Sequence, residues 1–329
     1  MKAIVWKEYG PPEVLQLAEV DKPAPKDNEV LIKIYAATAT AGDCEQRGLN
    51  LPFYYRLPMR LYVGIKKPKR ITVLGMDLAG EIEAAGKDVT LYNVGDQVFA
   101  ATGLHFGAYA QYTCLPAEPE DGALALKPTN MSYEEAAAVP TGGIEALHYM
   151  RKANIESGQQ VLISGAGGTI GPYAVQLAKY YGAEVTAVDS ADKLDMLSSI
   201  GADHFIDYAR QDFTKSSVTY DVIFDVVGKA SYSGCVRSLK PKGRYFIANP
   251  GLSHKFRGIW TSVTSSKKVA SGPASYKTDD LIFLGELIES GKLKSVIDRT
   301  YPLEEIVEAH KYVETGQKAG NVVITVSHE

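Results

Sequence analysis

The chain has 329 residues, a formal net charge of −4, and 45% hydrophobic and 22% charged residues. Its length is enough for two domains, and its composition is ordinary for a globular protein. The negative net charge excludes a globally basic surface, so we expect no nucleic-acid partner. The three cysteines, Cys44, Cys114 and Cys235, lie too far apart in sequence for a disulfide scaffold. With no signal-peptide-like or membrane-spanning run, this pattern predicts a cytoplasmic protein.

Residues 1 to about 125 show the pattern of an all-β region. Short apolar runs alternate with Gly, Pro and Asp, which punctuate strands and turns. The expected strands are Ala3–Trp6, Glu29–Ala36, Ala79–Ala84, Gln97–Ala100 and Ala108–Cys114.

From Ser132 the pattern changes to helices and then to alternating strands and helices. Ser132 and Glu135 form a capping-box signature, and the helical pattern up to Ala153 is interrupted at Pro140 and Gly142-Gly143. Such alternation predicts a doubly wound parallel sheet. The expected strands begin at Val161, Glu184, His204, Asp221, Gly243 and Lys268, with a last strand at Val322–Val326. The expected helices are Pro172–Tyr181, Asp192–Ile200, Ser231–Leu239, Asp279–Ser290 and Glu304–Thr315.

A glycine-rich stretch follows the strand that begins at Val161. Gly165, Gly168 and Gly171 have the spacing Gly-x-x-Gly-x-x-Gly and lead into the expected helix Pro172–Tyr181. Glycines allow a pyrophosphate to approach the backbone, and the helix N-terminus offers free N–H groups to an anion. An ordinary tight turn is the alternative. Asp189, at the end of the next strand, favours a dinucleotide site because a ribose-binding carboxylate is expected there.

Six motifs along the chain together resemble one protein family. They are Gly75–Gly80, Val94–Val98, Gly107–Tyr112, Val139–Gly143, Asp225–Gly228 and Gly320–Val323. In this order they resemble the medium-chain dehydrogenase/reductase superfamily, in particular its zinc-free quinone oxidoreductase-like branch. The resemblance implies an α/β fold. A GroES-like β-rich catalytic domain (residues 1–125, completed by 273–329) would flank a Rossmann domain (residues 126–272), with the active site in the cleft between them.

The resemblance also implies a nicotinamide cofactor site. Its expected residues are Thr141, Gly165, Gly167, Gly168, Thr169, Ile170, Gly171, Val227, Asn249 and Asn321. The residues near the expected ribose site do not all favour the same cofactor. Asp189 favours NADH because a carboxylate accepts hydrogen bonds from ribose hydroxyls and repels a 2′-phosphate.

Three residues beyond Asp189 argue for NADPH instead. Ser190 and Tyr208 offer hydroxyl donors and Lys193 offers a positive charge to a 2′-phosphate. Lys193 could alternatively be a solvated helix residue paired with Asp192 or Glu184. We predict NADPH, with NADH as the alternative.

The resemblance predicts no zinc. Zinc-dependent members carry a Cys and a His where this chain has Thr40 and Met76, which are not usual Zn²⁺ ligands. Asp43 and Asp77 remain nearby, and we expect them to be hydrogen-bonded to backbone N–H groups or to water. Without a Lewis acid the substrate should already be electrophilic, which favours quinones and α,β-unsaturated carbonyls. Thr40 and Asp43 are candidate residues of the substrate pocket.

The stretch Leu49–Arg70 combines aromatic, aliphatic and basic residues without an acidic one. Three interpretations stay open. Tyr54 and Tyr55 could stack on a flat substrate as part of the pocket wall. The stretch could be a surface hairpin packed by its aromatics, or it could attach to anionic lipid.

These observations predict a metal-independent, NADPH-dependent reductase of quinones or conjugated carbonyls. The alternatives are an NAD(P)-dependent alcohol dehydrogenase and a non-enzymatic cofactor-binding or RNA-binding protein. The resemblance further suggests a homodimer formed through edge strands of the cofactor domain, with a small molecule as the substrate.

Overall fold

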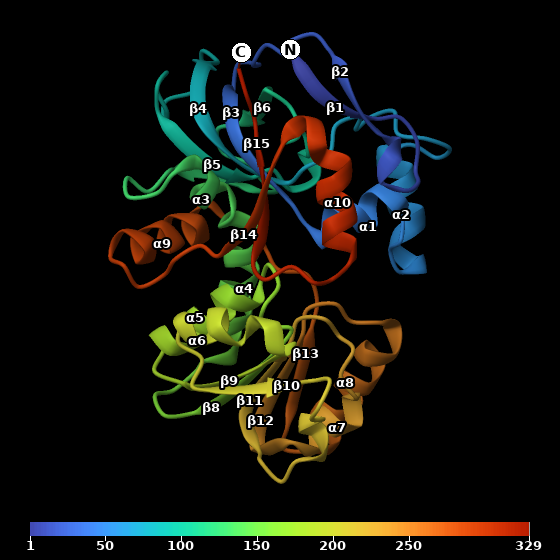
Figure 1. Cartoon of the computed structure of the whole chain (residues 1–329), viewed down its shortest axis with the longest axis vertical. Helices are drawn as coiled ribbons and strands as arrows, with labels where there is room; N and C mark the ends of the chain where they lie inside the picture. The colour runs from blue at the N-terminus through green and yellow to red at the C-terminus, as the bar shows by residue number, and fades with distance from the viewer. Residues whose placement is uncertain (329) are drawn as a thin grey trace. The chain divides into compact units, whose positions relative to one another are not determined.

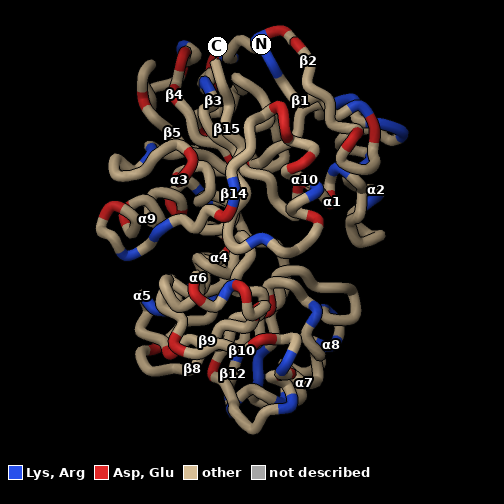
Figure 2. The backbone as a smooth tube through the Cα atoms, viewed as in Figure 1, with Lys and Arg blue, Asp and Glu red and all other residues tan. Residues whose placement is uncertain are grey.

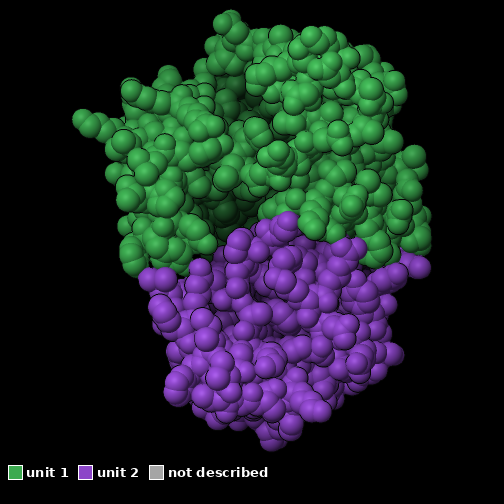
Figure 3. Space-filling view, turned by 180° about the vertical axis from the view of Figure 1, so that it is seen from behind, with its two compact units in different colours: residues 1–141, 276–291, 295–329 green, residues 142–275, 292–294 purple. Residues whose placement is uncertain are grey.

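The computed structural model describes residues 1–328, which divide into two compact units. Unit 1 comprises residues 1–141, 276–291 and those from 295 onward, and unit 2 comprises 142–275 and 292–294 (Figure 3). The domain ranges expected from the sequence stay predictions, because compactness and cofactor binding need not divide a chain at the same residue.

Unit 1 is built on a mostly antiparallel sheet to which both parts of the chain contribute. Its strand order is β14-β15-β3-β4-β5-β7, and β6 also pairs with β3. The C-terminal strand β15 pairs antiparallel with β3, with Val323 opposite Thr38. The strands are β3 (Glu29–Ala39), β4 (Asp77–Ala85), β5 (Gln97–Ala101), β6 (Tyr112–Pro116), β7 (Ala123–Leu126), β14 (Ile297–Pro302) and β15 (Asn321–Thr325). A separate hairpin joins β1 (Lys2–Trp6) to β2 (Leu15–Glu19).

Two helices interrupt the region that the sequence predicted to be all β. They are α1 (Ala41–Gly48) and α2 (Phe53–Val63), so that expectation is wrong for these residues. In α2 the aromatic residues and the internal Pro58 mask the helical pattern, since both disfavour a helix interior. The further helices are α3 (Tyr133–Ala137), α4 (Pro140–Ala153), α9 (Thr278–Glu289) and α10 (Ile306–Glu314). Short 3₁₀ turns lie at Pro12–Val14, Gly103–His105, Ala191–Lys193, Phe213–Lys215 and Leu303–Glu305.

Unit 2 contains a six-stranded parallel sheet with the order β10-β9-β8-β11-β12-β13 (Figure 1). This confirms the α/β fold predicted from the alternating pattern. The strands are β8 (Gln160–Ser164), β9 (Glu184–Asp189), β10 (His204–Asp207), β11 (Tyr220–Asp225), β12 (Leu239–Ile247) and β13 (Lys268–Ser271). The helices are α5 (Gly171–Tyr180), α6 (Leu194–Ser199), α7 (Tyr232–Arg237) and α8 (Leu252–Thr264). The sequence analysis did not predict α8.

The burial of the central strand β8 fixes the position of the glycine-rich turn that follows it. Val161, Leu162 and Ile163 are fully buried, as expected for a parallel strand covered on both faces. Helix α5 is buried from Gly171 through Ala178, so strand and helix hold both ends of the glycine turn. No helix within residues 1–328 has the length and apolar character needed to cross a membrane.

Candidate active site

The glycine turn between β8 and α5 is shaped by positions where a side chain cannot fit. Gly165 has φ +80°, and a Cβ there would lie 2.5 Å from a Val227 methyl carbon. A Cβ at Gly171 would collide with the backbone of Ala166. These contacts require glycine for a tight turn that brings the backbone close to the start of α5.

Gly168 differs from the other glycines of the turn. A Cβ at this position would meet no atom closer than the Gly165 carbonyl oxygen at 3.9 Å. The backbone is therefore open on this side, next to the N-terminus of α5, whose N-cap residue Ile170 makes no side-chain cap hydrogen bond. Such an open backbone cradle at a helix N-terminus fits the pyrophosphate of a dinucleotide. Thr169 and Ile170 complete the turn.

Asp189, at the end of β9, is locked against this turn. Its Oδ2 accepts a hydrogen bond from Gly167 N at 2.7 Å, and its Oδ1 accepts one from Ser190 N at 2.9 Å. Lys193 Nζ lies 2.9 Å from Oδ1, and both side chains are almost completely buried. Lys193 is therefore neither solvated nor paired with Asp192 or Glu184. Because Lys193 neutralises Asp189, the carboxylate repels a 2′-phosphate less strongly than we expected from the sequence.

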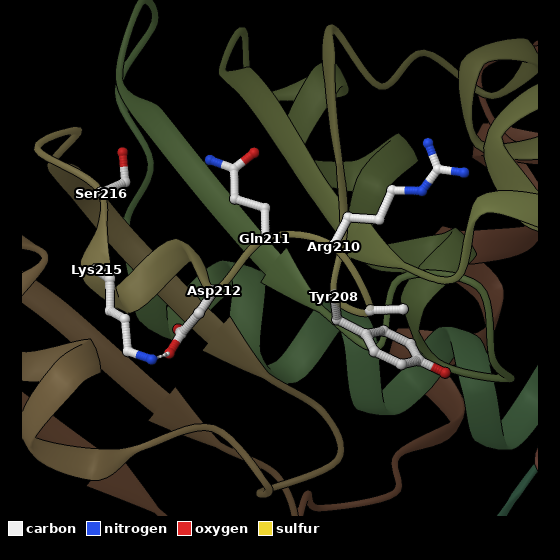
Figure 4. A pocket seen from close by; sticks show the side chains of 7 residues that line it. Tyr208, Arg210, Gln211, Asp212, Lys215 and Ser216 are labelled. Atoms are coloured by element: carbon white, nitrogen blue, oxygen red, sulfur yellow. Dashed lines mark ion pairs between the residues drawn. The ribbon is translucent and has the colours of Figure 1, made fainter.

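Tyr208 follows β10 and is anchored next to Asp189. Its backbone N donates to the Asp189 carbonyl oxygen at 3.2 Å, while its ring is exposed. Together with Ala209–Asp212, Lys215 and Ser216 it lines a shallow depression (Figure 4). Figure 4 shows Lys215 and Asp212 pointing toward one another, whereas Arg210 extends from the other end of the loop. Arg210 is an exposed cation that the sequence analysis did not single out.

The remaining predicted residues of unit 2 lie at the end of β11 and after β12. Val227 is half exposed and covers Gly165. Asn249 Nδ2 donates to the Val226 carbonyl oxygen at 3.1 Å. Asp225 is buried and accepts from Gly228 N at 2.9 Å, and burial raises its pKa. Asp225 therefore fixes the turn that presents Val227.

In unit 1, Thr40 and Asp43 form the capping box of α1. Thr40 N and Oγ1 donate to Asp43 Oδ2 at 2.9 and 2.6 Å, and Asp43 N donates to Thr40 Oγ1 at 3.2 Å. Asp43 is fully buried without a cation, and burial raises its pKa to about 6. The spacing Thr-x-x-Asp could have predicted this cap from the sequence.

Asp77, at the start of β4, is the second buried carboxylate of unit 1. Thr141 Oγ1 and N donate to its Oδ1 at 2.6 and 3.0 Å, and Thr38 Oγ1 donates to its Oδ2 at 3.0 Å. Burial, together with the charge of Asp43, raises its pKa to about 7. Thr141 is thus oriented by Asp77, a contact across 64 residues of sequence that no local pattern predicts.

A chain of buried polar groups that the sequence analysis missed continues from this region. Arg47 Nη1 donates to His310 Nδ1 at 2.8 Å, so the neutral imidazole carries its proton on Nε2, which lies 3.2 Å from the Tyr109 hydroxyl. Burial, with a smaller contribution from Arg47, lowers the pKa of His310 to about 3. Burial and the neighbouring Asp43 raise the pKa of Tyr109 well above its usual value. Arg47 also pairs with Glu314.

Tyr54 and Tyr55 lie on α2, not on a hairpin. Their ring centroids are 4.6 Å apart, and Phe53 packs edge-on against Tyr54 at 5.6 Å. Phe53, Leu57 and Leu61 are largely exposed, while Val63 is buried and anchors the helix. The helix therefore presents an aromatic and aliphatic surface.

Two further sequence predictions concern Asn321 and metal binding. Asn321 is buried, and its Nδ2 donates to the Val296 carbonyl oxygen at 3.2 Å. Within residues 1–328 no three His, Cys, Asp or Glu side chains are grouped so that they could hold a metal ion. Met76 is half buried next to Asp77.

Comparison with known families and proteins assigns the chain to a protein family. Residues 26–124 match the alcohol dehydrogenase GroES-like domain family, and residues 200–324 match the zinc-binding dehydrogenase family. A 2-methylene-furan-3-one reductase from Solanum lycopersicum is 34% identical, over 98% of this chain and 79% of that protein. The chain belongs to the quinone oxidoreductase branch of the medium-chain dehydrogenase/reductase superfamily. This confirms the resemblance read from the six motifs.

Two other similar proteins agree with this assignment. An NADPH-dependent alkenal/one oxidoreductase, chloroplastic, from Arabidopsis thaliana is 31% identical over 98% of this chain and 79% of that protein. The structure of the quinone oxidoreductase from Coxiella burnetii superposes with a TM-score of 0.88 and 31% identity, covering 99% of both chains. The chain is therefore an oxidoreductase that uses a nicotinamide cofactor.

Proposed function

We propose that the protein is an NADPH-dependent reductase of quinones and α,β-unsaturated carbonyl compounds. The observation that carries the proposal is the glycine turn, which is open at Gly168 and is held at the neighbouring Gly167 by the neutralised Asp189–Lys193 pair. The activities in the names of the similar proteins, an alkenal/one oxidoreductase and a quinone oxidoreductase, support the substrate class.

Different residues of unit 2 would bind different parts of the cofactor. We assign the pyrophosphate to the backbone of Gly168 and the N-terminus of α5, because the Gly167 N–H already donates to Asp189. We assign a 2′-phosphate to Ser190, Tyr208 and Arg210, because Lys193 is buried against Asp189, whereas the Arg210 side chain is 85% exposed, with its Nε 3.4 Å from Asp207 Oδ2. Bound NADPH would supply the hydride that the conjugated substrate accepts.

The protein itself must handle a proton, because the reduced conjugated system carries negative charge. Asp77 has a pKa of about 7 and is hydrogen-bonded to the Thr141 hydroxyl at 2.6 Å. At neutral pH it can therefore store a proton next to a hydroxyl group that can pass it on. We infer that Thr141 Oγ1, backed by Asp77, is the proton-donating group. Asp43 and Thr40 form a second such pair.

The test is an assay of the purified protein with NADPH and NADH against 2-alkenals, enones, quinones and simple alcohols. We expect turnover of conjugated acceptors with NADPH and little oxidation of alcohols. Robust alcohol oxidation would instead favour an alcohol dehydrogenase. Cofactor binding without turnover of any acceptor would favour a non-enzymatic role.

We further propose a homodimer without a nucleic-acid partner, and a cytoplasmic location. The parallel sheet of unit 2 ends in β10 and β13, and edge strands expose unpaired backbone groups that a second copy can pair with. Light scattering after gel filtration tests this, and a monomer at micromolar concentration would contradict it.

A further inference from the structure

Helix α8 is attached to unit 2 by one face only. A Cβ at Gly258 would lie 3.2 Å from a Val269 methyl carbon of β13, so helix and strand are in close contact. Ser262 Oγ accepts from Val269 N at 2.9 Å, and Thr261 Oγ1 lies 2.8 Å from the Tyr232 hydroxyl of α7. These contacts fix the rotation of α8 about its axis.

The opposite face of α8 is an exposed apolar stripe. Phe256 and Trp260 are both 72% exposed, Ile259 is 67% exposed and Val263 is 79% exposed, and Leu252 begins the same stripe. At about 100° per residue these positions fall within an arc of about 100°, roughly opposite Gly258 and Thr261. So many large apolar side chains facing solvent along one helix mark a contact surface.

The segment of chain that contains the stripe carries charge of one sign. Between Val226 and Thr278 the chain has ten Lys or Arg residues and no Asp or Glu, although the whole protein has a net charge of −4. They are Lys229, Arg237, Lys240, Lys242, Arg244, Lys255, Arg257, Lys267, Lys268 and Lys277. Figure 2 shows basic segments on α8 and beside α7.

Several of these cations flank the stripe itself. By helical geometry Lys255 and Arg257 lie on its two sides, and the Arg257 guanidinium is 4.1 Å from the centroid of the Tyr232 ring. Lys267 and Lys268 follow the C-terminal end of α8, and Lys268 Nζ donates to the Ser262 carbonyl oxygen at 3.2 Å. The stripe is therefore bordered by positive charge on both sides and at one end.

We propose that α8 is a peripheral membrane-binding helix that recognises anionic lipid. The helix would lie in the plane of the interface, with Phe256, Ile259, Trp260 and Val263 among the upper acyl chains and the bordering cations on lipid phosphates. A second copy bound through the stripe itself fits less well, because a two-fold contact there would bring the basic border against itself, whereas the dimer proposed above pairs edge strands.

This surface is distinct from α2, the segment for which the sequence left lipid attachment open. Both helices expose apolar residues beside basic ones, but α2 carries the tyrosines assigned to substrate. A variant of α2 is therefore a matched control, since Leu57→Ser and Leu61→Ser remove comparable exposed apolar area.

Trp260 makes the test specific to α8. The chain has two tryptophans, and Trp6 is fully buried in unit 1 while Trp260 is exposed. With phosphatidylcholine vesicles containing phosphatidylserine, we expect co-sedimentation, a blue shift of the emission, and quenching by brominated acyl chains. We expect none of these with pure phosphatidylcholine.

Variants then separate the contribution of the apolar stripe from that of the basic residues. Phe256→Ser with Val263→Ser should weaken binding to the anionic vesicles by tenfold or more, and Lys267→Glu with Lys268→Glu should abolish the dependence on phosphatidylserine. The α2 control should bind as the wild type does. Turnover of a water-soluble enone should be unchanged in the α8 variants, so failure of this proposal is distinguishable from failure of the proposed function.

Three results would overturn the proposal. One is unchanged vesicle binding in the Phe256→Ser and Val263→Ser variant. Another is equal binding to neutral and anionic vesicles. The third is a blue shift that grows with protein concentration when no vesicles are present, which would assign the stripe to contact between two copies.

Discussion

Buried carboxylates occur in both units, and their surroundings differ. In unit 2, Asp189 is bound by a buried lysine and two backbone N–H groups. In unit 1, Asp77 and Asp43 are bound by threonine hydroxyls and backbone N–H groups, with no cation on either. Burial raises the pKa of both acids in unit 1 to about 7 and about 6.

The comparison shows that burial alone does not decide what a carboxylate can do. A neighbouring cation pairs with the carboxylate and makes it a fixed anchor for a loop. Hydroxyl partners leave the acid able to hold a proton near neutral pH, which suits proton transfer. We therefore expect substitutions at the two sites to affect different properties of the protein.

Replacing Lys193 by Ala should have the largest effect. It leaves Asp189 buried without its cation, which costs about 3–5 kcal/mol of stability. We also expect kcat/KM to fall at least about tenfold for NADPH and little for NADH, because the bare carboxylate repels a 2′-phosphate. Steady-state kinetics with both cofactors, with urea unfolding, measure the two effects.

Lys179→Ala is the matched control for this variant. Lys179 also pairs with an aspartate, Asp203, but that pair is partly exposed and should contribute at most about 1 kcal/mol. If the wild type prefers NADH and Lys193→Ala treats both cofactors alike, Asp189 binds the ribose and the cofactor assignment is wrong.

Asp77→Asn should change how stability depends on pH. The pKa of Asp77 is raised from 3.8 to about 7, so the folded protein holds a proton that the unfolded chain releases. Its contribution is therefore complete below about pH 4 and is lost as the pH rises through 7, by an amount on the order of a few kcal/mol. Asparagine abolishes this loss, and urea midpoints at pH 5 and pH 8 would measure the change.

Asp212→Asn provides the opposite control. Asp212 is near the surface, and a hydrogen bond from Thr214 lowers its pKa. Asp212→Asn should therefore leave unchanged the decline of stability as the pH rises through neutrality. An unchanged decline in Asp77→Asn would mean that Asp77 is not the titrating group.

Tyr54→Ala and Tyr55→Ala test the surface of α2 and should have smaller effects. Loss of a stacking ring is worth about 0.5–1.5 kcal/mol, which corresponds to roughly two- to tenfold in kcat/KM for aromatic or long-chain acceptors. The KM for NADPH should stay the same. Leu61→Ala removes an exposed aliphatic group from the same helix as a control, and unchanged kinetics in the double tyrosine variant would assign both rings to packing.

The smallest expected effect is that of a chelator. Because Thr40 and Met76 occupy the positions where zinc-dependent relatives carry ligands, we expect well under one zinc per chain and no loss of activity with EDTA. Elemental analysis of protein purified without chelator checks this. A stoichiometric zinc required for activity would contradict the prediction.

Much of unit 2 could be predicted from the sequence because its signals are local. The buried run Val161–Ile163, the glycines of the turn and the start of α5 are consecutive in the chain. Helix α8 was missed because Gly258, Trp260 and β-branched residues lower helix propensity, and its apolar stripe points to solvent.

The site in unit 1 was only partly predictable. The capping box of Thr40 and Asp43 is a local pattern, but Asp77 and Thr141 meet only in the folded protein. The contacts among Arg47, Tyr109 and His310 join three separate segments. No periodicity in a single sequence reports such contacts.

The position of β15 has a consequence for the order of folding. The strand lies between β14 and β3, so the sheet of unit 1 has a gap at β3 until Asn321–Thr325 are available. Residues 142–275, in contrast, form nearly all of unit 2 and do not need β15. During synthesis unit 2 can therefore fold on the ribosome, while the N-terminal strands await the synthesis of Asn321–Thr325 with an unpaired edge. Premature termination would thus release a folded cofactor unit joined to an aggregation-prone remainder.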